Sequence, residues 1–187
     1  MSVTGTLHSI GLFPVKSTGG LSPTSAALDA DGLVGDRGFA VVDATGAALR
    51  AKSHPALAGL QVLGPPGAPR LQVPGGVSLA DLLGVPGARL APVAGGARQV
   101  EAVHVVSRRQ RTAPGAGDTA RANLVVDLHG GPEPDAGDWV GGTLRVGDVE
   151  LEVVGVPRHC GGVFARVLRG GTVRNGDVAE LRPGTPG

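Results

Sequence analysis

Residues 144–154, LRVGDVELEVV, alternate apolar and polar side chains on either side of the pair Gly147-Asp148. Successive side chains of a β-strand point to opposite faces of a sheet, so this pattern predicts two half-buried strands joined by a tight turn. The second strand runs into residues 155–162, GVPRHCGG, which contain Cys160, the one cysteine of the chain. A thiol at a point where a strand breaks into a turn can be held rigidly and still meet a ligand.

Cys160 has two interpretations on its local sequence. Its neighbours Arg158 and His159 are cationic or can become so, and cationic neighbours favour the thiolate, which is the form that attacks electrophiles and binds metals. A lone cysteine is also often a small buried apolar residue. The local sequence leaves both interpretations open.

Short β segments are predicted along most of the chain. Apolar runs bounded by Gly, Pro and Asn indicate strands at 3–13, 24–30, 39–43, 47–51 (after a turn at 44–46), 71–73, 102–107, 124–128, 161–168 and 171–181, the last of these around a turn at 175–177. A serine cap, apolar spacing and a terminal glycine predict one short helix at 78–84. Residues 89–101 are interpreted as a linker, 108–120 as irregular, and Trp139 as packing at a barrel end. The chain is therefore predicted to be mainly β, with few short helices.

The composition excludes several classes of protein. The 187 residues carry a net charge of +1 and only three Phe, one Trp and no Tyr, so we expect no nucleic-acid partner and no acidic membrane partner. A single cysteine forms no internal disulfide, which fits a reducing cytoplasm. No secretory signal and no apolar run of membrane-spanning length is found.

The common metal and nucleotide motifs are also missing from the sequence. The segment 29–32, DADG, is similar to the start of a calcium loop, but Gly38 stands where the closing acidic residue is needed, so calcium is rejected. The five histidines are scattered singly, and zinc is not supported. No phosphate-binding loop or dinucleotide fingerprint occurs.

Three basic segments are candidates for binding an anion. The turn-rich loop 14–20 carries Lys16 and hydroxyl groups, and Arg37 stands at the entrance of a strand, where a guanidinium can be fixed against a phosphate. The run 108–111 contains three arginines. Each segment also has an ordinary interpretation: a solvated turn, a polar contact between Asp36 and Arg37, and a solvated charged face.

Six segments in chain order resemble the MOSC domain family. The members of this family are molybdenum-cofactor proteins related to the C-terminal domain of cofactor sulfurases, and they include the amidoxime-reducing proteins. The segments are 10–17 (IGLFPVKS), 32–43 (GLVGDRGFAVVD), 52–57 (KSHPAL), 121–126 (RANLVV), 147–160 (GDVEL through PRHC) and 176–181 (GDVAEL). The resemblance is weakest at 64–101.

The resemblance implies an N-terminal MOSC-associated β subdomain over residues 1–95 and a MOSC β-barrel core over residues 96–187, or one compact unit made of both. It implies molybdenum cofactor (molybdenum-molybdopterin) between them, with Cys160 as catalytic residue and metal ligand. A thiolate suits a metal that already carries two dithiolene sulfurs. The cofactor-binding residues carried over from the family are Lys16, Ser17, Arg37, Arg121 and Asn123.

The activity implied is a molybdenum-dependent oxidoreductase that reduces N-hydroxylated or other N–O small molecules. Its electrons would come from a separate donor protein, because the chain has no flavin, haem or iron–sulfur motif. One alternative is a sulfur-carrier or cofactor-handling protein with a persulfide on Cys160, and another is a non-catalytic, degenerate MOSC domain. Pyridoxal phosphate binding is implied at the level of the family alone, and no lysine is assigned to it.

The chain departs from the family pattern in several places. His159 stands directly before the cysteine where the family usually has arginine, and Ala122 replaces the proline before Asn123. The aromatic-Met pair after Asp36-Arg37 is reduced to Phe39-Ala40. The segment before Ala102 is also shorter than in the reductases, which would leave a smaller lid over the site.

Overall fold

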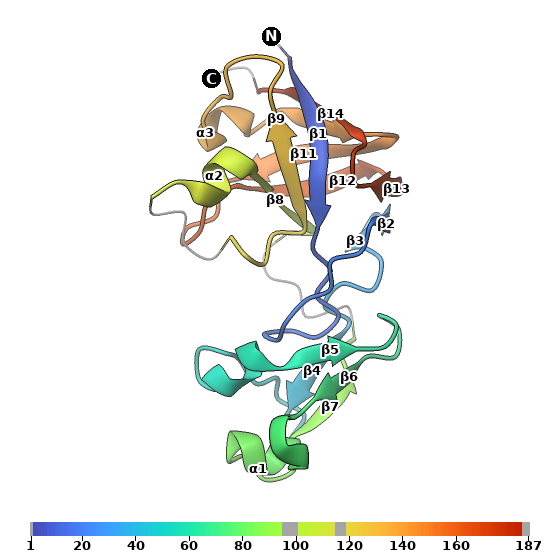
Figure 1. The fold of residues 1–187 in the computed structure, drawn as a ribbon, viewed down its shortest axis with the longest axis vertical. Coiled ribbons are helices and arrows are strands. Elements are labelled where there is room, and N and C mark those ends of the chain that lie inside the picture. The colour runs from blue at the N-terminus through green and yellow to red at the C-terminus, as the bar shows by residue number, and fades with distance from the viewer. Residues whose placement is uncertain (1, 95–100, 115–118, 185–187) are drawn as a thin grey trace. The chain divides into compact units, whose positions relative to one another are not determined.

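The computed structural model describes residues 2–94, 101–114 and 119–184 (Figure 1). The chain folds into two compact units. The barrel unit consists of Met1–Gly11, Ser22–Val34 and Gln99–Gly187, and the small unit consists of Leu12–Leu21 and Gly35–Arg98. The expected boundary between residues 95 and 96 stays a prediction. The contacts divide the chain discontinuously, because strands from both ends of the sequence pair in one barrel.

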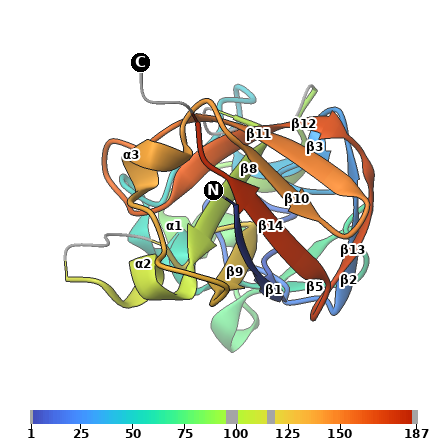
Figure 2. The same ribbon diagram turned by 90° about the horizontal axis from the view of Figure 1, so that it is seen from above.

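Seven strands close the barrel in the order β1-β14-β10-β11-β12-β8-β9 (Figure 2). Neighbouring strands are antiparallel except β8 and β9, which are parallel, and β1 closes the barrel by pairing with both β14 and β9. The mainly β fold expected from the sequence is therefore confirmed. The strands are β1 (Val3–Ile10), β8 (Val103–Ser107), β9 (Leu124–Leu128), β10 (Thr143–Val146), β11 (Val149–Gly155), β12 (Val163–Arg169) and β14 (Val178–Arg182).

The predicted hairpin at 144–154 forms β10 and β11, and its apolar side chains fill the barrel. Arg145 and Glu150 stand opposite each other across the pair, and Gly147 turns the chain with a φ of 56°. Burying each Leu or Val side chain contributes about 1.5–3 kcal/mol. The side chains of this hairpin that are completely buried are Leu144, Val146, Val149, Leu151 and Val153.

Outside the barrel, the barrel unit carries two short helices and a small sheet. The helices are α2 (Arg108–Thr112) and α3 (Ala136–Trp139), and the sheet joins β2 (Ser25–Asp29), β3 (Gly32–Leu33) and β13 (Gly171–Arg174) in the order β13-β2-β3. The expectation that residues 108–120 are irregular is wrong for α2. Ser107 and Gln110 form a capping box that starts this helix. Residues 115–118 of that segment lie outside the described residues.

In its described residues, the small unit has four short strands and a core of its own. Its elements are β4 (Phe39–Val42), β5 (Gln61–Leu63), β6 (Arg70–Gln72), β7 (Arg89–Pro92), α1 (Leu79–Leu83) and the 3₁₀ helices η1 (Pro55–Gly59) and η2 (Pro74–Gly76). The predicted helix is confirmed: the Ser78 Oγ accepts a hydrogen bond from the Asp81 N–H, and Gly84 ends the helix in the left-handed conformation. The core consists of Val41, Leu49, Leu57 and Leu60.

Two expectations about the small unit are wrong. Residues 47–51 form no strand, and their pairing is the single bridge between Ala48 and Val42. The Asp43 carboxylate accepts hydrogen bonds from the Thr45 and Ala47 N–H groups, which ties this segment into a turn. The predicted linker 89–101 begins with β7, which pairs with β4 along its whole length. The rest of that linker includes residues 95–100, which lie outside the described residues.

Candidate functional site

The Cys160 turn, residues 156–162, joins β11 to β12 and lies tightly against β8. Gly162 has a φ of 91°, and a Cβ added to it would lie 2.3 Å from the Val105 carbonyl oxygen and 3.1 Å from His104 Nε2. The backbone therefore approaches β8 as closely as glycine allows. The Cys160 side chain beside this contact is half-buried, so the thiol is neither sealed in the core nor fully in solvent.

His104 is the side chain that faces this turn from the barrel wall. Its Nε2 lies 2.9 Å from the Gly161 carbonyl oxygen and 4.0 Å from Cys160 Sγ. The imidazole is 4% exposed, and its centroid lies 5.5 Å from that of the Phe164 ring. His104 was not predicted as a site residue, because a single histidine inside the apolar strand 102–107 has no local feature that links it to a residue 56 positions away.

Asn123 is completely buried and connects β8 to the end of β1. Its Oδ1 accepts a hydrogen bond from the His104 N–H at 3.1 Å, and its Nδ2 donates to the Gly11 carbonyl at 3.2 Å. The backbone of Asn123 also donates to the His104 carbonyl at 2.8 Å. Asn123 therefore positions His104, while its expected contact with a cofactor stays a prediction. Arg121, two residues earlier, is half-buried.

The small unit brings the sequence-predicted residues Lys16 and Arg37 together. Segments 13–16 and 37–39 run side by side: the Arg37 N–H donates to the Phe13 carbonyl, and the Lys16 N–H donates to the Phe39 carbonyl, each at 2.8 Å. Burial lowers the pKa of Lys16, and the positive charges of Arg50 and Arg37 lower it further. Lys16, Arg37 and Arg50 thus form a cationic cluster, and Arg50 is a member that was not predicted from the sequence.

Arg37 is held rigidly within this cluster. Its guanidinium forms an ion pair with Asp36 and lies 5.6 Å from the centroid of the Phe13 ring. The same Asp36 carboxylate accepts a hydrogen bond from the Phe13 N–H at 2.7 Å. The polar contact between Asp36 and Arg37 is therefore present, and any anion bound by Arg37 would meet a guanidinium that is already oriented.

Two of the predicted binding residues have an unusual backbone conformation. Ser17 has a φ of 65° and Arg37 a φ of 52°, and they are the only residues other than glycine with a positive φ in the described part of the chain. This conformation is uncommon for residues with a Cβ and persists where the surrounding structure enforces it. Both positions belong to the set carried over for phosphate and pterin.

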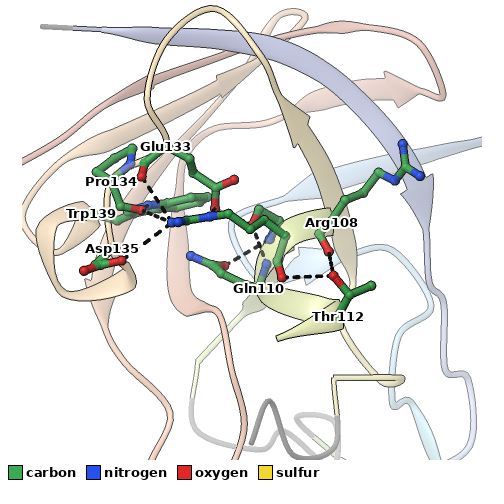
Figure 3. Close-up of polar contacts among 9 residues, drawn as sticks. Arg108, Gln110, Thr112, Glu133, Pro134, Asp135 and Trp139 are labelled. Atoms are coloured by element: carbon green, nitrogen blue, oxygen red, sulfur yellow. Dashed lines mark hydrogen bonds and ion pairs between the residues drawn. The ribbon is translucent and has the colours of Figure 1, made fainter. Parts of the chain in front are cut away.

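Two of the three arginines of residues 108–111, Arg108 and Arg109, are paired with carboxylates of β9 and of the acidic loop, residues 129–138. Arg108 forms an ion pair with Asp127 at 2.8 Å, and its hydrogen bond lowers the pKa of that carboxyl. Figure 3 shows the loop residues Glu133, Pro134 and Asp135 next to α2. Arg109 lies 3.4 Å from the Glu133 carboxylate and 3.6 Å from that of Asp135. The positive charge of Arg108 and Arg109 is therefore largely compensated within the barrel unit.

Glu133 is the central residue of this contact. Its side chain is 8% exposed, and it accepts a hydrogen bond of 2.5 Å from the Ser107 hydroxyl in addition to the contact with Arg109. The next residue, Pro134, accepts a hydrogen bond from the fully buried Trp139 through its carbonyl oxygen. Glu133 thereby connects the acidic loop to α2 and the end of β8, and Pro134 connects it to Trp139 of α3.

We expect Glu133→Ala to lower the free energy of unfolding by about 1–3 kcal/mol, because the buried Ser107 hydroxyl loses its acceptor. Asp135→Ala is the matched control, since that side chain is 91% exposed and its loss should change stability by less than about 0.5 kcal/mol. Urea unfolding followed by circular dichroism measures both. Equal stabilities of the two variants would contradict this role of Glu133.

Comparisons with known proteins identify the family. The family model described as the MOSC N-terminal beta barrel domain matches residues 4–122, which is more than half of the chain. The chain belongs to the MOSC family. The expected resemblance is thus confirmed. The matched range begins in β1 and ends at Ala122, so it includes residues of both units of this MOSC chain.

A solved structure shows the same fold over nearly the whole length of the MOSC chain. The YUAD protein from Bacillus subtilis superposes with a TM-score of 0.54 at 13% sequence identity, over 99% of each chain. At this identity the likeness concerns the fold alone. Among curated proteins, none matches the chain.

The MOSC barrel carries a small cavity beside the Cys160 turn, with a volume of about 240 Å³. Phe164, whose ring packs against that of His104 at an angle of 56°, forms part of its wall, and Arg158 lies two residues before Cys160. The remaining wall is mostly apolar. The lining residues are Glu101, Val154, Gly155, Val156, Arg158 and Phe164.

The predicted site residues of the MOSC chain fall into two sets. Arg121, Asn123 and Cys160 belong to the barrel unit, and Lys16, Ser17 and Arg37 belong to the small unit. Within the described residues there is no group of three or more His, Cys, Asp or Glu side chains that could hold a metal ion. No helix in that same part of the chain is long and apolar enough to cross a membrane.

Proposed function

We propose that this MOSC protein binds molybdenum cofactor and reduces N-hydroxylated or other N–O small molecules, with Cys160 as the protein ligand to molybdenum. The observation that carries the proposal is the placement of the one thiol in the chain. Cys160 is half-buried on a turn that the close approach of Gly162 to Val105 fixes against the barrel. A soft thiolate in a fixed position suits a metal whose other ligands are also sulfur.

The residues present fit this cofactor better than they fit a metal ion held by side chains alone. The described residues contain no cluster of three candidate ligands, whereas a metal that brings two dithiolene sulfurs needs only one from the protein. When bound, the cofactor would supply two-electron redox chemistry at the metal. The phosphate of its pterin requires charge-assisted donors, and the cationic cluster offers Lys16 and Arg50 beside the Arg37 guanidinium that Asp36 orients.

Each remaining site residue has a proposed part. Ser17 would donate its hydroxyl to the phosphate, and Arg121 would add a half-buried guanidinium. Asn123 would act on the cofactor indirectly, by ordering the backbone at His104 and Gly11. Its Oδ1 accepts from the His104 N–H, and its Nδ2 donates to the Gly11 carbonyl. The unusual backbone conformations of Ser17 and Arg37 support these roles, because such conformations concentrate at ligand sites.

The substrate would be a small molecule that enters the cavity lined by Phe164, which at about 240 Å³ admits only a small ligand. Reduction of an N–OH group consumes two electrons and two protons and releases water. A separate donor protein would supply the electrons, because the sequence has no flavin, haem or iron–sulfur motif. We also propose a cytoplasmic location, where a lone thiol stays reduced.

The proposal is tested by measuring molybdenum in the wild type, Cys160→Ala and Cys160→Ser, each purified from a host that synthesises the cofactor. We expect a near-stoichiometric molybdenum content in the wild type and a content at least about tenfold lower in both variants. The control His129→Ala changes an exposed residue outside the Cys160 turn and should retain the wild-type content.

Two results would count against the proposal. Equal molybdenum in the wild type and Cys160→Ala would remove Cys160 as the ligand. Absence of molybdenum from every variant, in a host shown to make the cofactor, would contradict cofactor binding. Detection of a persulfide on Cys160 would then favour a sulfur carrier.

A further inference from the structure

We infer that His104 is a positioning residue for Cys160: its Nε2–H holds the Gly161 carbonyl and faces the sulfur, so that the thiol keeps one direction. The inference deepens the proposed function, because a metal ligand must point at the metal. The orientation of the Cys160 side chain by His104 involves only residues of the barrel unit, and it can be tested without any cofactor.

The contact with Gly161 defines the tautomer of His104. A carbonyl oxygen only accepts hydrogen bonds, so the 2.9 Å contact between His104 Nε2 and the Gly161 oxygen assigns the proton to Nε2. The Nε2 lone pair is then not available to take a proton from Cys160. His104 in this arrangement is not the base of a Cys–His pair. It presents an N–H group to Sγ, which lies at 4.0 Å.

The imidazole itself cannot turn freely. Asn123 binds both the N–H and the carbonyl of His104, at 3.1 and 2.8 Å, and the Phe164 ring packs against the imidazole. The residue is 4% exposed. A chain of contacts therefore runs from Gly11 through Asn123 and His104 to the Cys160 turn, and each member of this chain is held by the one before it.

The turn lies close to the ring because residue 162 is glycine: an added Cβ there would lie 3.1 Å from His104 Nε2. The hydrogen bond to Gly161 prevents it from moving away. Cys160 sits next to this pinned peptide, which restricts the directions open to its side chain.

The alternative is a histidine that only fills space in the barrel wall, and two substitutions separate the two roles. His104→Phe keeps a ring against Phe164 and removes the N–H group. His104→Gln loses the ring but can place an amide N–H near the position of Nε2. Packing alone favours the Phe variant, whereas positioning favours the Gln variant.

The test uses protein without cofactor, labelled with ¹³C at cysteine, because a chain with one cysteine has one Cβ signal. The couplings between Hα and the two Hβ protons report the χ1 rotamers of Cys160. We expect one dominant rotamer in the wild type, averaged couplings in His104→Phe, and a return toward the wild type in His104→Gln. His129→Phe, a histidine whose ring also contacts a backbone carbonyl, should leave the couplings unchanged.

A second readout is the retention of molybdenum on dialysis, which should fall about 10–100-fold in His104→Phe, as for other residues that orient a metal ligand. Wild-type couplings in His104→Phe would overturn the inference, and so would equal averaging in the Phe and Gln variants. If His104→Phe does not fold, Asn123→Ser is used instead, because it shortens the side chain that binds His104. Wild-type couplings of Cys160 in Asn123→Ser would also overturn the inference. A wild type without molybdenum but with the expected couplings would remove the proposed function and leave the positioning role intact.

Discussion

Gly5→Val is expected to prevent the barrel from folding. A Cβ at Gly5 would lie 2.0 Å from the Asp127 carbonyl oxygen and 2.8 Å from Leu128 Cα, both of them backbone atoms of β9. β1 cannot move away from β9, because Gly5 also pairs with Ala179 of β14 on its other side. Glycine in a strand is typical of such a close approach of another backbone.

The expected loss in the free energy of unfolding for Gly5→Val exceeds about 4 kcal/mol. Domains of this kind are stable by about 5–15 kcal/mol, so a large part of the variant should be unfolded at room temperature. Circular dichroism and the dispersion of an NMR spectrum measure the folded fraction. The matched control is Gly155→Ala in β11, where an added Cβ meets no atom within 4 Å. Wild-type stability of Gly5→Val would show that β1 and β9 do not close the barrel in this way.

Gly162→Ala is the second substitution with a large expected effect, and it acts at the Cys160 turn. The φ of 91° costs a residue with a Cβ about 1–2 kcal/mol. The added methyl would also lie 2.3 Å from the Val105 carbonyl oxygen. We expect a total loss of about 2–4 kcal/mol and a displaced turn.

Gly176→Ala separates these two causes. Gly176 has nearly the same φ, 92°, but a Cβ there meets nothing within 4 Å. It should therefore lose only the conformational part, about 1–2 kcal/mol, and leave Cys160 undisturbed. Urea unfolding compares the two variants, and the Cys160 couplings report the turn. Equal losses in both, with unchanged couplings, would mean that the contact with Val105 does not hold the turn.

Elements that depend on a short local pattern were predictable from the sequence. The β10–β11 hairpin follows from the alternation of side chains around Gly147, and helix α1 follows from its Ser78 cap and Gly84 stop. Cys160 was singled out because it is the one thiol and stands at the end of a strand. The order of six segments was sufficient for the family, because each segment can be compared without knowing its partners.

What depended on a distant partner was not predictable. Residues 89–92 became a strand because β4 pairs with them, and Arg109 is compensated by Glu133, 24 residues along the chain. Lys16, Arg37 and Arg50 became one cationic cluster only when their segments came together.

The same division applies to the candidate site. The mainly β MOSC fold and the single thiol at the end of a strand follow from the sequence alone. The folded barrel was needed to see that His104, 56 residues from Cys160, faces that thiol, and that Asn123 is a buried support for His104. The physical reason is that period, caps and turns act within a few residues, whereas strand pairing and side-chain burial are properties of the closed barrel.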